Sequence, residues 1–170
     1  MLDIRTIRLE DEGAYREFQR LLQEENNPFI SPKILKEGEF AAFVERSKRR
    51  ETQTDHPDWS TSTNYYAFKV GQMAGRIGCR WQLEKGNLAT VGGHIGYVTA
   101  PNFRQKGVMT ALLDFALERY RERGIRAVLI TADETNQASR KTIEKAGGIL
   151  ENNISIEDDK RLARYWIHVN

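Results

Sequence analysis

The sequence predicts an α+β fold, in which about four helices flank a central, mostly antiparallel sheet of six to seven strands. Two observations predict it. Apolar residues recur at helical spacing in four segments, whereas seven other segments show alternation or short apolar runs typical of strands. These segments follow one another as strand, two helices, three strands, helix, strand, helix and two strands. That order places helices on both faces of a mixed sheet.

Composition limits the class of protein. The chain has 170 residues, enough for one full core, and we expect residues 1–170 to form a single domain. A net charge of +2 is too small to indicate a nucleic-acid partner, and no apolar run approaches the roughly 18 residues that span a bilayer, so no membrane partner is expected. The single cysteine, Cys79, and an N-terminus without an apolar signal sequence favour a cytoplasmic protein.

The first half of the chain predicts one strand and two helices. Residues 4–9 alternate as in a short strand, and residues 10–25 have the apolar stripe of an amphipathic helix. Ser31 as N-cap and Pro32 as first helical residue predict a second helix that runs to about Arg49. The polar segment 51–63 then reads as a loop.

The second half contributes most of the sheet. Two strands, 65–70 and 73–83, are joined by a tight turn at Gly71-Gln72. The remaining predicted elements are a strand at 93–99, a helix at 108–123, a strand at 127–132, a helix at 137–146, and strands at 154–157 and 162–169 that form a hairpin across 158–160.

A basic, glycine-centred turn opens the helix at 108–123. Its sequence is Arg104-Gln105-Lys106-Gly107-Val108-Met109-Thr110. The first N–H groups of a helix have no intrahelical acceptor, and the helix dipole adds positive charge there, so such a turn suits a pyrophosphate. Gly107 lets the backbone approach an anion, and Arg104 and Lys106 can donate charge-assisted hydrogen bonds. The alternative is an ordinary solvated turn with two surface cations.

This turn resembles the acyl-CoA-binding motif of the GNAT-type N-acetyltransferases, Arg/Gln-x-x-Gly-x-Gly/Ala. Arg104 and Gly107 match the motif, and Met109 stands where the family has a small residue. The likeness continues through residues 130–139, which contain Asn136, and the helical segment 141–148. The runs 92–97, 138–145 and 164–167 resemble a bacterial subgroup of predicted acetyltransferases.

The resemblance implies acetyl-CoA as cosubstrate, without a metal. It implies that the strand ending at Thr99 and the next strand splay apart near Val98 and Thr131, so that the pantetheine arm bonds the strand edge as an added strand would. The cofactor-binding residues that it assigns are Tyr97, Val98, Thr99, Arg104, Gln105, Lys106, Gly107, Val108, Met109, Thr110, Asn136 and Ser139. From the residues alone, Asn136 is equally a helix N-cap.

Acyl transfer to an amine needs a base and an acid. Many family members have a tyrosine acid at the position that Ile143 occupies here. His94 is the predicted base, because its ordinary pKa of about 6.5 suits that role; a purely structural histidine between small residues is the alternative. Tyr165 is a candidate acid. Cys79 is not expected to be a nucleophile, because direct transfer needs none.

The acceptor is expected to be a primary amine of a small molecule or peptide. The regions that would shape its pocket contain the aromatics Phe29, Phe40, Phe43, Trp59, Tyr65 and Tyr66, with the carboxylates Glu37, Glu39 and Asp55 nearby. Such a pocket would suit a cationic amine. The alternative function is a catalytically weak CoA-binding sensor or scaffold protein. The open edge of the last hairpin allows a homodimer.

Overall fold

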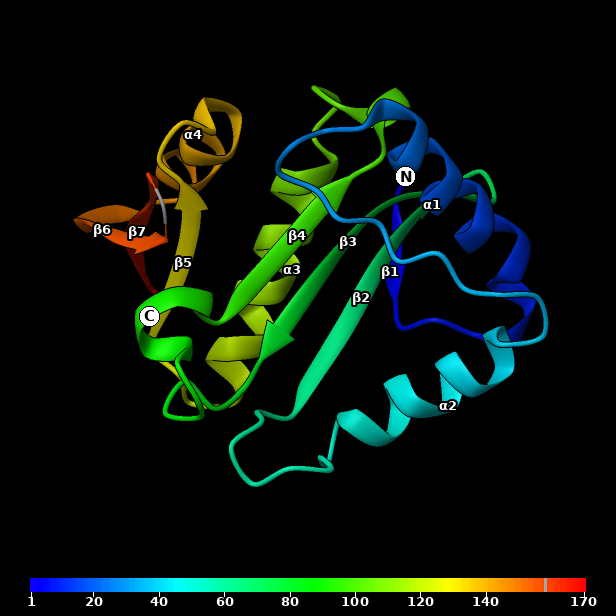
Figure 1. Ribbon diagram of the computed structural model, residues 1–170, viewed down its shortest axis with the longest axis horizontal. Helices are drawn as coiled ribbons and strands as arrows, with labels where there is room; N and C mark the ends of the chain where they lie inside the picture. Colours follow the sequence, from blue (N-terminus) through cyan, green and yellow to red (C-terminus); the bar gives the residue numbers. More distant parts are fainter. Residues whose placement is uncertain (158) are drawn as a thin grey trace.

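The computed structural model describes residues 1–157 and 159–170. The strands are β1 (Asp3–Arg5), β2 (Ser62–Lys69), β3 (Gln72–Arg80), β4 (Ile95–Thr99), β5 (Ala127–Asp133), β6 (Ile149–Glu157) and β7 (Lys160–His168). The helices are α1 (Glu12–Glu25), α2 (Phe40–Arg50), α3 (Val108–Glu122) and α4 (Gln137–Lys145), with short helical turns at Leu9–Asp11, Leu88–Gly92 and Pro101–Phe103. Figure 1 shows their arrangement.

The seven strands form one sheet in the order β1-β2-β3-β4-β5-β7-β6. Every pair of neighbours is antiparallel except β4 and β5, which are parallel. Hairpins join β2 to β3 and β6 to β7, whereas α3 crosses over between the two parallel strands, as a parallel pair requires. The predicted α+β class and mostly antiparallel sheet are therefore confirmed.

Helices cover both faces of the sheet. The apolar stripe of α3 lies fully buried on one face, where Leu112, Leu113 and Ala116 pack with Ile77 and Ile130. On the opposite face α1 and α2 enclose a second core. In Figure 1, α3 lies behind the sheet, whereas α1 and α2 lie in front of it, and the segment that joins them passes across the end of β4.

Several predicted boundaries were wrong. The second helix begins at Phe40 rather than Pro32, because residues 31–39 are irregular and Gly38 has a left-handed φ of 81°. The first strand is shorter than 4–9, and β6 begins at Ile149, five residues before the predicted start at Ile154. Asp158, in the predicted turn of the last hairpin, lies outside the described residues.

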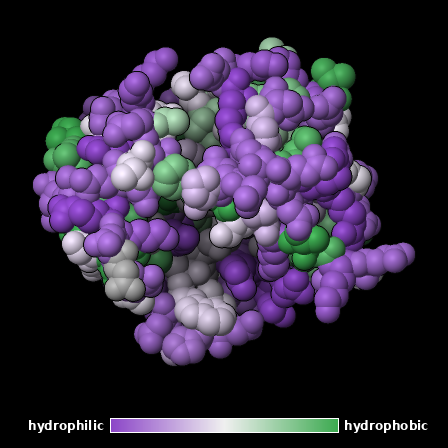
Figure 2. Space-filling view, turned by 45° about the horizontal axis from the view of Figure 1, so that its top comes forward, coloured by the Kyte–Doolittle hydropathy of each residue, from purple (hydrophilic) through white to green (hydrophobic). Residues whose placement is uncertain are grey.

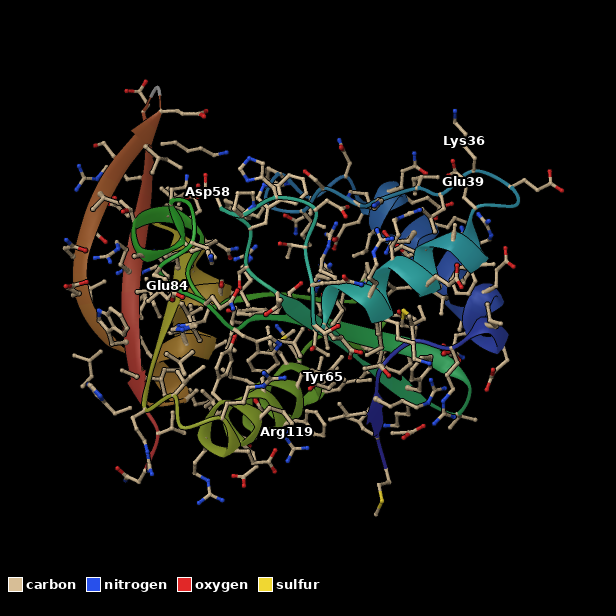
Figure 3. All side chains as sticks on the ribbon, turned by 90° about the horizontal axis from the view of Figure 1, so that it is seen from below. Lys36, Glu39, Asp58, Tyr65, Glu84 and Arg119 are labelled. Atoms are coloured by element: carbon tan, nitrogen blue, oxygen red, sulfur yellow. The ribbon has the colours of Figure 1, made fainter. Side chains whose placement is uncertain are left out.

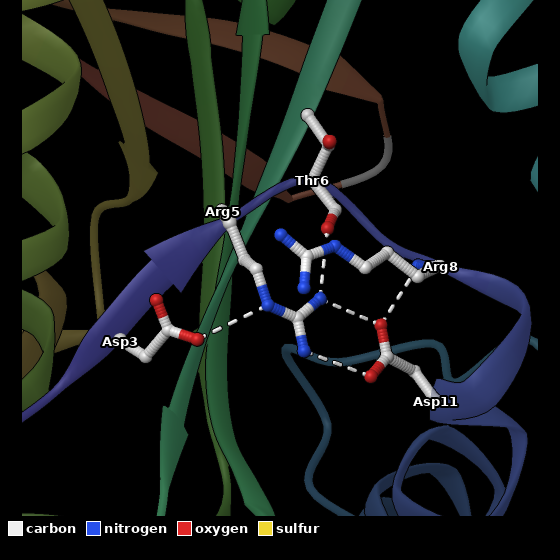
Figure 4. A network of polar contacts seen from close by, with 5 residues as sticks. All are labelled: Asp3, Arg5, Thr6, Arg8 and Asp11. Atoms are coloured by element: carbon white, nitrogen blue, oxygen red, sulfur yellow. Dashed lines mark hydrogen bonds and ion pairs between the residues drawn. The ribbon is translucent and has the colours of Figure 1, made fainter.

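A polar network fixes the entry to α1 (Figure 4). The Arg5 guanidinium donates to both Asp11 oxygens, at 2.7 and 2.9 Å, and the Arg8 N–H donates to Asp11 at 2.7 Å. Burial alone would raise the pKa of the Asp11 carboxyl, but the hydrogen bonds from Arg5 and Arg8 outweigh it and leave this pKa below its ordinary value. The ionised pair therefore joins β1 to the start of α1.

The outer edge of the sheet is formed by β6, where Ile149 and Leu150 are exposed. An unpaired edge with apolar side chains suits pairing with another strand. The homodimer inferred from this hairpin stays a prediction.

Candidate active site

The parallel strands β4 and β5 pair only where β4 begins, against the middle of β5. Ile95 and Ile130 are their single register pair. Just before it, His94 N–H donates to Leu129 O at 2.8 Å, and Leu129 N–H donates to His94 Nδ1 at 2.9 Å. Toward the ends of both strands the two backbones diverge (Figure 1). The structure thus shows the splay that the resemblance implied near Val98 and Thr131.

Gly93 makes this junction possible. Its φ and ψ of 66° and −170° lie in a region that only glycine adopts readily. A Cβ at this position would lie 2.7 Å from Leu129 O, far inside normal contact distance. No residue larger than glycine therefore fits at position 93, next to the point where His94 joins β4 to β5.

A cavity of about 620 Å³ opens where β4 and β5 separate. All the residues predicted to bind the cofactor line it, with the exception of Lys106. They come from β4, the turn before α3, the first turn of α3 and the start of α4. The side chain of Lys106 instead donates to Asn102 O at 3.2 Å. The structure brings the other predicted residues together in one place, although their role as cofactor ligands stays a prediction.

The first turn of α3 points its N–H groups at this cavity. Gly107 is the N-cap, with a left-handed φ of 79°, and Ala111 N–H makes the first ladder bond, to Gly107 O at 3.1 Å. The N–H groups of the three residues between them precede that ladder. The helix dipole adds partial positive charge at these N–H groups. An anion such as a diphosphate fits this position.

Arg104 lines the cavity, and its guanidinium forms an ion pair with an acidic side chain. Its Nη2 donates to Glu25 Oε1 at 2.8 Å and to Thr99 O at 3.2 Å, and its Nη1 donates to the second Glu25 oxygen. Glu25 ends α1, and no local pattern in the sequence links it to Arg104, which is 79 positions away. An anion that binds Arg104 has to compete with this carboxylate.

The edge of β4 that faces the cavity offers backbone groups. Ala100 N–H donates to Ala74 O at 2.8 Å, toward β3. Because backbone groups alternate along a strand, those of Tyr97 and Thr99 point to the side of β5. Beyond Ile95 this side has no register partner on β5. An extended ligand could bond there as an added strand does.

Asn136 and Tyr97 shape the wall formed by α4. Asn136 Oδ1 accepts from Ser139 N–H at 3.2 Å, which is the predicted N-cap. The Tyr97 hydroxyl lies 2.6 Å from Ser139 Oγ and links β4 to α4. Burial raises the pKa of Tyr97, and the hydrogen bond to Ser139 only partly opposes this, so the phenol keeps its proton at neutral pH.

The structure does not support His94 as the base. His94 is buried, it does not line the cavity, and its Nδ1 already accepts the Leu129 N–H. A neutral histidine that accepts at Nδ1 carries its proton on Nε2, so neither nitrogen is left to take up a proton. Burial lowers its pKa to about 4. The structural alternative describes His94 better.

Tyr165 and Cys79 also lie apart from the cavity. The Tyr165 hydroxyl donates to Glu144 at 2.7 Å and accepts from Arg140 at 2.9 Å, on a side of α4 that does not line it. The candidate acid role of Tyr165 therefore finds no support. Cys79 is fully buried, and burial raises the pKa of its thiol to about 12, so it is not a nucleophile.

A second cavity, of about 260 Å³, lies between α1, α2 and the sheet. Ile30 and Val98 line both cavities, so the two meet at β4. Among the predicted aromatics, Phe43 and Tyr66 line the second cavity. Figure 2, with the top of Figure 1 turned toward the viewer, shows a mostly hydrophilic face around a central hollow.

The other residues expected at the acceptor pocket do not line the second cavity. Tyr65 faces α3, where its ring lies 5.0 Å from Phe115 (Figure 3). Glu39 lies beside Lys36 at the outer start of α2 and accepts its N–H at 2.8 Å. Neither Glu37 nor Asp55 lines the cavity. The second cavity is lined instead by four cations, Lys33, Arg46, Arg50 and Arg76.

Two further observations concern metal binding and membrane insertion. In the part of the chain that the structure describes, no group of three or more histidine, cysteine or acidic residues is arranged to hold a metal ion. None of the described helices has the length and apolar content needed to cross a membrane.

A splayed parallel pair with a helix N-terminus beside the gap is an arrangement that suits an extended, diphosphate-bearing ligand. Residues 39–148 match the Acetyltransferase (GNAT) family, and the chain belongs to that family. No curated protein is significantly similar to it in sequence.

Solved structures show the same fold. A GNAT acetyltransferase of Streptococcus pneumoniae is similar over 100% of both chains, with a TM-score of 0.69 and 19% identity. An acetyltransferase of Salmonella typhimurium that modifies the N-terminal serine of a 50S ribosomal subunit protein has a TM-score of 0.72 and 18% identity, over 99% of this chain and 95% of that one. The microcin self-immunity acetyltransferase MccE, solved with acetyl-CoA and AMP, has a TM-score of 0.76 and 15% identity, over 99% and 92%.

Proposed function

We propose that the protein transfers the acetyl group of acetyl-CoA to a primary amine of a small molecule or peptide, by direct attack in a ternary complex. The observation that carries this proposal is the meeting of two cavities at Val98 and Ile30. The first fits the diphosphate and the extended arm of CoA, and the second is separate from it. The buried, unpaired Cys79 suits a reducing compartment such as the cytoplasm.

Transfer requires that the amine nitrogen attack the thioester carbonyl, the C–S bond break, and one proton move from the amine to the sulfur. N–H groups on the open edge of β4 can polarise the carbonyl oxygen. Only about one lysine-like amine in 10³ is neutral at pH 7. Among the described residues, no carboxylate or histidine lines either cavity. The four cations of the second cavity favour the neutral amine instead, because nearby positive charge lowers the pKa of an ammonium group.

Tyr97 is the proposed proton donor to the departing thiolate. It is the phenol that lines the cofactor cavity, and its hydroxyl lies against Ser139 at the wall formed by α4. Tyr97→Phe keeps the ring and removes the proton. We expect kcat to fall about 100-fold, the lower range for a general acid, with acetyl-CoA binding unchanged. An unchanged kcat would remove Tyr97 from the mechanism.

The experiment that tests the function is thiol release from acetyl-CoA with a panel of primary amines, followed by mass analysis of the amine products. Transfer predicts thiol release that depends on the amine and a product heavier by one acetyl group. Binding of CoA without turnover on any amine would favour the CoA-binding sensor or scaffold.

A further inference from the structure

The second cavity has an unusual charge for a site expected to take an amine. Arg76 projects from β3 into its floor, Arg46 and Arg50 lie on one face of α2, and Lys33 lies in the segment between α1 and α2. In the part of the chain that the structure describes, no carboxylate is among the lining residues. Four positive charges therefore converge on a volume of about 260 Å³.

These cations differ from most arginines near them. On α2, Arg49 pairs with Asp55 at 3.5 Å, and on α1, Arg16 and Arg20 pair with glutamates of their own helix. None of the four lining cations forms a salt bridge within the described residues. The positive charge of this cavity is therefore not neutralised by acidic side chains among the described residues.

Arg76 gives the strongest indication. It is half-buried in the sheet, with Tyr66 and Val98 as its register partners on the neighbouring strands. Its Nε is buried and has no hydrogen-bond partner among the described residues. A buried donor without an acceptor costs about 1 to 3 kcal/mol, more when charged. An anion in the cavity, paired with the Arg76 guanidinium, would offset that cost through its charge.

The arrangement on α2 adds to this. Arg46 and Arg50 are four residues apart, so they are neighbours on the helix surface, and Phe43 and Ser47 complete the same cavity-facing side. Like charges at this spacing destabilise a helix by a few tenths of a kcal/mol. A negatively charged ligand would turn this repulsion into attraction.

We propose that the acceptor amine carries an anionic group, a carboxylate or a phosphate, which Arg76 binds at the floor with Arg46, Arg50 and Lys33 at the rim. This inference rests on the proposed function and narrows its substrate class. Val98, where the cavities meet, is the register partner of Arg76 on the adjacent strand, and adjacent strands are only about 4.8 Å apart. The anionic group and the amine are therefore separated by a few bonds in the acceptor.

Matched amines test the proposal. Alanine and alaninamide differ in the carboxylate, and phosphoethanolamine and ethanolamine differ in the phosphate. We expect kcat/KM for at least one anionic member to exceed that of its neutral partner tenfold or more, and the two pairs show which anion is preferred. Equal or lower kcat/KM for both anionic members would overturn the proposal.

Variants assign the effect to residues. Arg76→Gln should reduce the preference for the anionic amine to less than about threefold, with the affinity for acetyl-CoA unchanged. Arg46→Gln, at the exposed rim, provides a second test should Arg76→Gln fold poorly. Lys48→Gln removes a charge from the same helix outside the cavity, and it should retain the full preference. Full preference in both arginine variants would contradict the assignment.

A binding measurement separates this inference from the proposed function. With the protein saturated by CoA, calorimetric titration with inorganic phosphate should detect one site in the wild type and in Lys48→Gln. The same titration of Arg76→Gln should show binding at least tenfold weaker. Absence of CoA binding would contradict the proposed function. Binding of CoA without binding of phosphate, together with no preference for anionic amines, would contradict only this inference.

Discussion

The two cavities that meet at Val98 are built in different ways. The cavity between β4 and β5 is made largely by backbone: a strand edge, a helix N-terminus and a glycine junction. The cavity between α1 and α2 is made by side chains, with four cations that form no salt bridge among the described residues. In the first, the arginine of the motif is paired with Glu25. Recognition by backbone suits a ligand shared by many proteins, whereas recognition by side chains suits an acceptor particular to this one.

The largest expected effect is at the junction of the first cavity. In Gly93→Ala the new Cβ meets Leu129 O at 2.7 Å, at a φ of 66°. We expect the free energy of unfolding to fall by about 3 to 4 kcal/mol, since strain and clash act together. Urea denaturation measures this.

Gly96→Ala is the matched control on the same strand, where the nearest atom to the new Cβ is 4.0 Å away. It should change stability much less. Equal stability of Gly93→Ala and the wild type would show that the junction does not depend on its backbone geometry.

His94 predicts a pH dependence of stability. Its pKa is about 4 in the folded protein because it is buried, against about 6.5 when unfolded. Below pH 6.5 the unfolded chain therefore binds a proton that the folded chain does not, and stability falls as the pH falls. Between pH 7 and pH 5 the wild type should lose about 2 kcal/mol through this group.

The measurement is urea denaturation at both pH values. His94→Asn should lose much less between them, and His168→Asn, at an exposed position, should behave as the wild type. The same loss in His94→Asn and the wild type would contradict a neutral, structural His94.

The ion pair at the start of α1 should affect the second cavity without affecting the first. Asp11→Asn removes the buried one of the two ionised partners of Arg5, and we expect a loss of about 1 to 2 kcal/mol in stability. Because α1 lines the second cavity, KM for the amine should rise while the affinity for acetyl-CoA stays within about twofold. Asp3→Asn, which removes the more exposed partner of Arg5, is the control. A weaker affinity for acetyl-CoA with an unchanged amine KM would contradict this prediction, because the effect would then lie at the first cavity.

The smallest effect concerns Glu25. In Glu25→Gln, Arg104 loses its acidic partner, and a diphosphate no longer competes with a carboxylate for it. The pair is partly exposed, so we expect acetyl-CoA to bind only about two- to fivefold more tightly. Glu24→Gln, on the exposed side of the same helix, should leave the affinity unchanged. Weaker binding in Glu25→Gln would indicate that Glu25 orients Arg104 for the ligand.

The lining of the first cavity was predictable because its signals are local. Gly107 before an amphipathic helix, and Asn136 at the start of another, describe backbone geometry within a few residues. The second cavity combines Arg76, Arg46 and Lys33 from three distant segments, and no local pattern shows that they converge. The sequence left two alternatives for His94, a base and a structural residue, for the same reason, because its pairing with Leu129 appears only in the folded sheet.

The most direct test of the account is a calorimetric titration with CoA and with pantetheine, which lacks the diphosphate. If the first turn of α3 binds the diphosphate, CoA binds at one site with a dissociation constant below about 1 mM, within the usual range of enzyme KM values, and pantetheine binds at least tenfold more weakly. No heat with CoA at millimolar concentration, or equal affinity for the two ligands, would contradict it.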